Sequence, residues 1–348
     1  MNAQRSSDSV PVSSWRSARL FVTDEFAAPP VILRVNDSVI GTLGNFSAST
    51  GKAKSKKTFN VCAIVAAAMT GGTVLNYSAS LPPERRRVLY VDTEQSRFHC
   101  KRVLCRILRL AGLPTDAHPP LLEFLCLRGY ATKERLRKIE EAIYDLDDLG
   151  LVVIDGIRDL AHDINSPGEA TDLITKLMQW TDERRIHIHT VLHLNKGDDN
   201  TRGHLGTELN NKAETVLQIT KDDFDRDISS VAAMHIRDRD FEPFAFRINA
   251  DALPEQVEDY QLRQTTAAKS FDYAEVCEAK HREALELLFS KADRVSYSSL
   301  IGRLQSSYAA IGHSFGINKA KQLKVFLENK RMIVKEDRFY RYNSDFHY

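Results

Sequence analysis

The chain has 348 residues, of which 43% are hydrophobic and 27% charged, and its formal net charge is +1. These values are close to the average for soluble globular proteins, and the length allows one large domain and one small one. No apolar run approaches the roughly 18 residues of a membrane helix, and the first residues lack the pattern of a secretory signal, so we expect a cytoplasmic protein without membrane contacts.

The cysteine content and the charge distribution indicate more closely which kind of soluble protein this is. Five cysteines form no CxxC pair and no Cys/His spacing suited to zinc, and their odd number argues against a disulfide framework. We expect buried free thiols in a reducing compartment. From residue 279 onward there are 13 Lys and Arg against 7 Asp and Glu, whereas the rest of the chain is slightly acidic. A basic small domain hints at nucleic acid, although many basic surfaces are only solvated faces.

The first part of the chain is an arm followed by alternating elements. Residues 1–28 are Ser-rich and polar and end in a Pro-Pro pair, so we expect a flexible arm with at most a short helix. From Val31 short β-type runs alternate with longer helical stretches, which indicates βαβ units and a mostly parallel sheet. The predicted strands are 31–33, 44–50, 88–92, 122–127, 151–155 and 189–194, and the predicted helices are 57–69, 96–111, 133–146 and 170–183.

The later part of the chain changes in pattern. Residues 215–220, 231–237 and 244–248 predict consecutive antiparallel strands, with 222–227 as a charged hairpin tip. Residues 251–278 contain Pro254 and no clear periodicity, which is typical of a linker. Beyond it, helices at 281–289, 297–307 and 319–329 and strands at 332–335 and 339–342 suggest a winged helix, a variant of the helix-turn-helix. The expected divisions are therefore 1–28, 29–250, 251–278 and 279–348.

A phosphate-binding loop is predicted between the second strand and the first long helix. The eight residues Gly51-Lys52-Ala53-Lys54-Ser55-Lys56-Lys57-Thr58 fit GxxxxGK[ST] except that Lys56 stands where the motif has Gly. The N–H groups of Ser55 to Thr58 would face the β-phosphate, Lys57 would reach the β- and γ-phosphates, and Thr58 would hold Mg²⁺. Lys56 would have to adopt backbone torsions that Gly tolerates better. The alternative is a basic loop that binds phosphates nonspecifically.

Two apolar strands end in acidic residues. Leu151 to Asp155 is a buried-strand pattern whose carboxylate would emerge beside the phosphate loop and hold Mg²⁺ through water. Val88 to Asp92 is followed by Glu94, which we expect on the strand beside the phosphate loop, where it would polarise the water that attacks the γ-phosphate. The alternatives are a structural role for Asp155 and helix capping by Asp92 or Glu94.

With these features the chain resembles the RecA-type ATPases, and within them the RepA-type plasmid replicative helicases and their relatives on mobile elements. The resemblance spans about residues 31–248 and rests on the loop ending at Thr58, on Glu94, on Asp155 and on the segment Val191-Leu-His193-Leu-Asn-Lys196. It implies a RecA-like α/β core that binds ATP and Mg²⁺, with His193 as γ-phosphate sensor. A satisfied core histidine is the alternative.

The same resemblance implies contacts with DNA and with neighbouring subunits. Residues 197–206 would match a DNA-facing loop, although Gly and polar residues also suit any mobile loop. Arg237 and Arg239, expected on one strand with Ile236, would match a basic pair that enters the neighbouring subunit's ATP site. The alternative is an exposed strand with alternating charges.

The leading hypothesis is a homo-oligomer, a hexameric ring, that hydrolyses ATP and translocates on single-stranded DNA for plasmid or mobile-element replication. Residues 159–168 and 197–206 would contact the single strand, helix 319–329 would contact duplex DNA or a partner, and a primase or relaxase is a candidate partner. Lys56 favours an alternative, an ATP-binding, weakly hydrolysing DNA-binding regulator or assembly factor. A kinase ranks last because no acceptor-site motif is seen.

Overall fold

The computed structural model describes residues 15–194, 203–222, 225–258, 260, 273 and 276–345. The chain divides into two compact units, residues 1–262 and 263–348. Within the described ranges, none of the helices is long and apolar enough to cross a membrane.

The first unit alternates strands and helices as βαβ repeats do. Its elements are η1 (Trp15–Ala18), β1 (Val31–Val35), β2 (Ser38–Thr42), β3 (Phe46–Gly51), α1 (Lys57–Thr70), β4 (Thr73–Val74), β5 (Tyr77–Ala79), η2 (Pro83–Arg85), β6 (Arg87–Asp92), α2 (Arg97–Leu110), β7 (Leu122–Cys126), α3 (Thr132–Asp145), β8 (Leu149–Asp155), η3 (Ile157–Leu160), α4 (Pro167–Arg184), β9 (His187–His193), α5 (Gly203–Lys212), β10 (Thr215–Lys221), β11 (Ile228–Ile236), β12 (Phe244–Ile248) and β13 (Pro254–Val257).

The main sheet has nine strands in the order β13-β12-β11-β10-β3-β9-β8-β6-β7. Pairing is parallel from β10 to β7 and antiparallel from β10 to β13, which confirms the predicted mostly parallel sheet with late antiparallel strands. The expectation that residues 251–278 form only a linker is wrong at β13, which pairs with β12. Pro254 is compatible with this strand because it is the first residue of a strand at the sheet edge.

Several short elements were not predicted. Strands β2, β1, β5 and β4 form a separate four-stranded sheet, of which only β1 was expected, and α5 was expected to begin as a loop. Strands of two to five residues carry too few side chains for an alternating pattern to show in the sequence.

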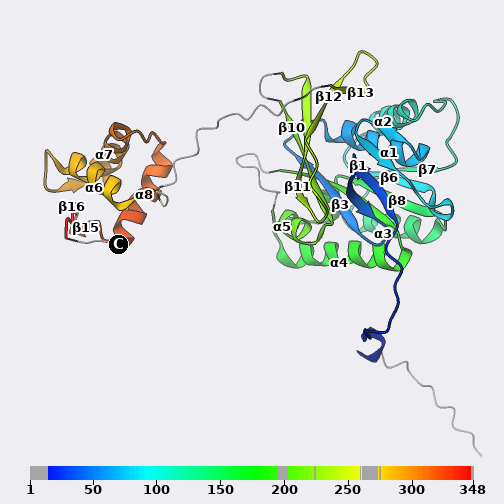
Figure 1. Cartoon of the computed structure of the whole chain (residues 1–348), viewed down its shortest axis with the longest axis horizontal. Helices are drawn as coiled ribbons and strands as arrows, with labels where there is room; N and C mark the ends of the chain where they lie inside the picture. The colour runs from blue at the N-terminus through cyan, green and yellow to red at the C-terminus, as the bar shows by residue number, and fades with distance from the viewer. Residues whose placement is uncertain are drawn as a thin grey trace, which may run out of the picture. The chain divides into compact units, whose positions relative to one another are not determined.

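Side-chain alternation along the parallel strands builds a core on each face of the main sheet. On β6, Val88 and Tyr90 pack with residues of α1 and α2, whereas Leu89 and Val91 pack on the opposite face with residues of α3, α4 and α5. The sheet thus lies between two helical layers (Figure 1). Burying one such large aliphatic side chain stabilises the fold by roughly 1.5–3 kcal/mol.

Helix α1 is held in the middle of this arrangement. Its sequence KTFNVCAIVAAAMT is apolar on nearly all sides, as expected of a buried helix, and all of its residues from Asn60 to Met69 are buried. It ends at Gly71, whose φ of 66° is the left-handed conformation common after a helix. The loop before α1 is therefore fixed between a buried strand and a buried helix.

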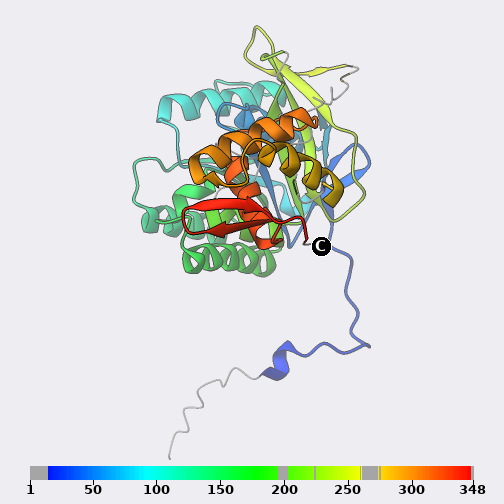
Figure 2. The same cartoon turned by 90° about the vertical axis from the view of Figure 1, so that its left-hand side faces the viewer.

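The second unit contains the predicted helices and hairpin. Its elements are α6 (Glu278–Phe289), β14 (Val295–Ser296), α7 (Tyr297–Ala310), α8 (Ile317–Asn329), β15 (Ile333–Glu336) and β16 (Phe339–Tyr342). The strands form a three-stranded sheet in the order β14-β16-β15. The red hairpin of β15 and β16 and the three helices are visible in Figure 2. One apolar cluster, which includes Leu285, Leu304, Leu323 and Met332, joins the helices to this sheet.

Candidate nucleotide-binding site

Four neighbouring parallel strands end at one edge of the main sheet. Gly51 ends β3, His193 ends β9, Asp155 ends β8 and Asp92 ends β6. Because ligands of open α/β sheets bind outside the carboxyl ends of the strands, this edge is the expected place for a site. The expectation that Glu94 follows the strand beside the phosphate loop is wrong, because β9 and β8 lie between β3 and β6.

Glu94 nevertheless reaches the site through a close contact with the next strand. Thr93 Oγ1 donates to the carbonyl oxygens of Asp155 and Gly156 at 3.2 and 2.9 Å. Gly156 has a φ of +101°, and a Cβ built there would lie 2.2 Å from Thr93 Oγ1 and 2.9 Å from Glu94 Cγ. Only glycine fits at this position, because the absence of a side chain lets the β6 turn cross over the end of β8.

The phosphate loop has the left-handed residue that the motif requires. Lys56 has φ 66° and ψ 28°, the conformation expected of the missing Gly, and the strain is on the order of 1–2 kcal/mol for a residue with a Cβ. Its Nζ donates to the carbonyl oxygen of Asp227, in the segment between β10 and β11. Burial, and next the charge of Lys221, lower the pKa of Lys56. The lysine therefore replaces Gly in conformation and adds a tie to the β10–β11 hairpin.

The start of the loop differs in detail from the expectation. Gly51 is the last residue of β3, and a Cβ built on it would lie 2.3 Å from the carbonyl oxygen of Ile219. The Ser55 N–H, which we expect to face a phosphate, donates to Lys52 O at 3.2 Å. Ala53 and Lys54 are exposed.

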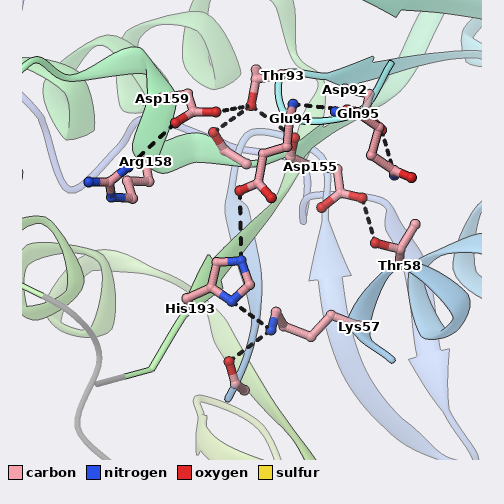
Figure 3. A network of polar contacts seen from close by, with 12 residues as sticks. Lys57, Thr58, Asp92, Thr93, Glu94, Gln95, Asp155, Arg158, Asp159 and His193 are labelled. Carbon is pink, nitrogen blue, oxygen red and sulfur yellow. Dashed lines mark hydrogen bonds and ion pairs between the residues drawn. The ribbon is translucent and has the colours of Figure 1, made fainter. Parts of the chain in front are cut away.

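Lys57 belongs to the polar network in Figure 3 and is only 6% exposed. Its Nζ donates to the carbonyl oxygens of Gly51 and Lys52 at 2.8 and 2.9 Å, and it lies 3.0 Å from His193 Nδ1. Burial lowers the pKa of Lys57 to about 8, and Asp155 and Glu94 oppose that shift. If an anion bound here, the Lys57 ammonium group would exchange its two carbonyl acceptors for a charged acceptor, which forms a stronger hydrogen bond.

Thr58 and Asp155 form an oxygen pair beside Lys57. Thr58 Oγ1 and Tyr90 Oη each donate to Asp155 Oδ2 at 2.9 Å. Burial raises the pKa of Asp155 to about 6, and Asp92 adds to the rise. A hydroxyl and a carboxylate are the hard oxygen donors that Mg²⁺ prefers. Among the described residues no group of three or more His, Cys, Asp or Glu could hold a metal ion, so water and phosphate oxygens would have to complete the coordination.

His193 connects Lys57 to Glu94 (Figure 3). Its Nε2 lies 3.7 Å from Glu94 Oε1, too long for a hydrogen bond but close enough for an electrostatic contact. When Nδ1 accepts from Lys57, a neutral ring carries its proton on Nε2, facing Glu94. The imidazole is the main cause that lowers the pKa of Glu94. Because 42% of the Glu94 side chain is exposed, water can reach the ionised carboxylate.

Asp92 does not cap α2, whose N-cap residue is Ser96, but shapes the turn that follows β6. Its carboxylate accepts from the Glu94 and Gln95 N–H groups at 3.0 and 2.7 Å and from Gln95 Nε2 at 2.8 Å. These bonds occupy both oxygens and shape the turn before α2. Asp92 is therefore structural, and Glu94 is the acid that faces the site.

These groups surround a cavity of about 330 Å³. It brings together Lys57, Thr58, Glu94, Asp155 and His193 from four segments of the chain. Part of its wall was not foreseen, because α2 contributes residues at helical spacing from His99 to Arg106. The sequence signal that could have identified this wall is the position of α2, which begins directly after the turn that carries Glu94. The remaining lining residues are Lys54, Ser55, Lys56, Phe59, Gln95, His99, Arg102, Val103 and Arg106.

Arg237 and Arg239 lie away from this cavity. Strand β11 ends at Ile236, so the expected strand from 236 to 239 is wrong beyond its first residue, and both arginines are exposed. Ile236 pairs with Thr215, which pairs with Ser47 near the start of β3. The arginines therefore lie at the opposite edge of the sheet from the phosphate loop of the same chain.

The two segments expected to contact DNA are only partly loops. Residues 197–202 lie outside the described residues, and Gly203 to Gly206 begin α5 instead of continuing a loop. In the other segment Asp159 belongs to η3 and Gly168 to α4, which leaves 161–166 between them. Asp159 accepts from Thr93 Oγ1 at 3.1 Å and lies 3.5 Å from Arg135 Nη1, so its role here is structural.

Comparison with known protein families agrees with this geometry. A crystal structure of the RadB recombinase is similar to this chain, with a TM-score of 0.44 and 15% sequence identity over 62% of this chain and 92% of that one. No curated protein matches the sequence. A family model described as an AAA domain matches residues 16–199, more than half of the chain. The resemblance to RecA-type ATPases is thereby confirmed as far as a P-loop ATPase core, and the chain belongs to this family of AAA domains.

Proposed function

We propose that the protein hydrolyses ATP in the cavity between the phosphate loop and Glu94. The observation that carries the proposal is the meeting of Lys57, Thr58, Asp155, Glu94 and His193 in one cavity. They supply a cation that binds phosphate, oxygen ligands for Mg²⁺, a carboxylate that orients the attacking water and an imidazole that contacts the γ-phosphate. A basic loop that bound phosphates nonspecifically would not be expected to lie beside acidic and imidazole groups from the ends of three other strands.

In the proposed reaction, water attacks the γ-phosphorus and the bond to the β-phosphate oxygen breaks, which gives ADP and phosphate. Lys57 binds the β- and γ-phosphate oxygens at the positively polarised start of α1. Glu94 orients the water and accepts its proton, because its carboxylate is ionised and reachable by solvent. His193 contacts the γ-phosphate. Because its ring also lies beside Glu94, loss of the γ-phosphate would alter the surroundings of the Glu94 carboxylate.

Thr58 and Asp155 would hold Mg²⁺, which would neutralise charge on the β- and γ-phosphates. The donors fit this role because they already share a hydrogen bond of 2.9 Å and Asp155 is nearly buried.

For the biological process we propose a hexameric, RepA-type DNA helicase that serves a plasmid or mobile element. The family and the basic second unit support this, and single-stranded DNA is the proposed stimulating ligand. Arg237 and Arg239, at the far edge of the sheet, are available to reach the ATP site of a neighbouring subunit. A primase or relaxase is the proposed kind of partner.

We further propose that the second unit is a winged helix. The order α6-β14-α7-α8-β15-β16 is that of three helices with a closing hairpin. Helix α8 exposes Asn318, Lys321, Gln322 and Val325, among them amide and ammonium groups of the kind that bond to base edges and phosphates. Duplex DNA is the proposed ligand of this face.

The second candidate is an ATP-binding regulator or assembly factor that hydrolyses ATP poorly. Lys56 favours it, because its tie to Asp227 O joins the phosphate loop to a hairpin that a typical Gly would leave unattached. In that case ATP would bind to the phosphate loop without turnover.

Steady-state hydrolysis with and without single-stranded DNA at low salt separates the two candidates, with Glu94→Gln as the blank. A motor should be stimulated about tenfold or more by DNA, in the range expected for an effect on transition-state groups, and Glu94→Gln should remove turnover but not binding. Tight Mg-ATP binding without turnover would support the regulator. Failure to bind ATP would overturn the proposal.

A further inference from the structure

We infer that Arg102, on α2, is a catalytic residue that binds the γ-phosphate of ATP held by the same chain. This rests on the proposed ATP hydrolysis and adds a residue to that site. The role differs from that of Arg237 and Arg239, which lie at the opposite edge of the sheet.

One face of α2 forms a wall of the cavity. His99, Arg102, Val103 and Arg106 line it, and their spacing of three, four and seven residues places them on one side of a helix. Lys57 and Glu94 line the same cavity. A triphosphate bound by Lys57 therefore shares this cavity with the arginines of α2.

The two arginines of this wall have different surroundings. Arg106 is 9% exposed, its Nε donates to Ala252 O at 3.0 Å, and its guanidinium lies 3.7 Å from the centre of the Phe59 ring. These contacts fix α2 against the start of α1. Arg102, one turn earlier, is exposed and has no hydrogen bond or ion pair among the described residues. Its guanidinium is therefore available to a ligand, and Arg106 holds the helix that carries it.

The balance of charges in the cavity favours a phosphate contact from a cation that has no acidic partner. Lys57 lies among Asp155 and Glu94, whose carboxylates offset its charge, so a cation without an acidic partner adds most to the binding of a phosphate. Helix α2 contains no acidic residue. A planar guanidinium donates two parallel hydrogen bonds to a phosphate and stabilises the charge that develops on the γ-phosphoryl oxygens. ADP has no such group, so the contact must distinguish ATP from ADP.

The test uses the full-length protein with Arg102→Ala and Arg102→Lys, and with Lys101→Ala as the matched control. Lys101 is the preceding residue, is exposed, and does not line the cavity. We expect Arg102→Ala to lower kcat on the order of 10²–10³-fold, the size expected for one lost donor to transition-state charge. Arg102→Lys should be intermediate, and Lys101→Ala should match the parent protein.

Binding provides a readout that does not depend on turnover. Displacement of a fluorescent nucleotide should show AMP-PNP affinity falling about tenfold in Arg102→Ala, as for a lost charge-assisted contact, with ADP affinity unchanged. An unchanged preference for AMP-PNP over ADP would overturn the inference while leaving the proposed ATPase intact. If the parent protein bound neither nucleotide, the proposed function itself would fail.

A mixing experiment tests whether Arg102 acts within its own chain. Lys57→Ala and Arg102→Ala chains each have a defective site of their own, so a mixture should stay inactive when Arg102 acts in the same chain. Recovery of activity in the mixture would show that Arg102 acts on a neighbour and would overturn the inference.

Discussion

Strand β9 carries His187, His189 and His193 on one face of the main sheet; the first two are buried in the protein interior, and the third lies at the carboxyl end of the strand. In the interior, Ser47 Oγ lies 2.7 Å from His187 Nε2 and 2.8 Å from His189 Nδ1. Ser49 Oγ lies 2.8 Å from His189 Nε2. At the carboxyl end, the partners of His193 are the charged groups of Lys57 and Glu94.

The difference shows that surroundings, rather than residue type, separate structural from functional histidines on this strand. Burial, with a contribution from His187, lowers the pKa of His189 to about 3, so the ring stays neutral and both nitrogens are used by serine hydroxyls. His193 is half-buried and lines the cavity.

Lys57→Ala should weaken ATP binding on the order of a hundredfold or more, because it removes the cation that faces the phosphates. Isothermal titration with Mg-ATP measures this, with Lys101→Ala as the control. Affinity equal to that of the parent protein would contradict the placement of the phosphates at this end of β3.

The same substitution at two histidines should give opposite results. His193→Asn should lower kcat about 10–100-fold with little effect on the melting temperature, because it changes a group in the cavity. His189→Asn should leave the kcat of folded molecules unchanged but destabilise the protein by about 1–3 kcal/mol, because it leaves a buried hydroxyl without its partner. Thermal unfolding and kinetics of both variants measure this. If His189→Asn lost turnover at full stability, the division would be wrong.

The pH dependence of kcat/KM should be bell-shaped, with limbs near the pKa values of about 6 for Asp155 and about 8 for Lys57. Asp155 must be ionised to hold Mg²⁺, so activity falls as pH drops through about 6. Lys57 must be protonated to bind phosphate, so activity falls as pH rises through about 8. The buried interior histidines add no limb. The profile of kcat/KM reports the pKa values of the free enzyme. In the profile of kcat the two limbs should lie further apart, because bound Mg²⁺ and phosphate stabilise the charged forms of Asp155 and Lys57.

Lys56→Gly should have the smallest effect. It removes left-handed strain on the order of 1–2 kcal/mol but loses the bond to Asp227 O and makes the unfolded chain more flexible, so stability should change by less than about 1 kcal/mol. Turnover should stay the same or rise a few-fold. A large gain in turnover would mean that Lys56 restrains hydrolysis and would favour the regulator.

Much of the site followed from local patterns. A strand, a basic loop and a helix fixed Lys57 and Thr58, and apolar runs ending in acids located Asp155 and Glu94, because strand burial is readable from four or five consecutive residues. The wall formed by α2 was missed, since a basic amphipathic helix looks the same whether it faces a cavity or solvent. The short strands β2, β4, β5, β13 and β14 were missed because they contain too few residues for an alternating pattern to show.

The sequence by itself determined the alternating strands and helices, the phosphate loop and the acids at the strand ends, because these depend on neighbours within a few residues. Only the tertiary structure decided the strand order, which places β9 and β8 between Glu94 and the phosphate loop. It also decided which histidine meets Lys57, which arginine enters the cavity, and that Arg237 and Arg239 lie at the other edge. Those relations depend on pairing between distant segments, which no local pattern records.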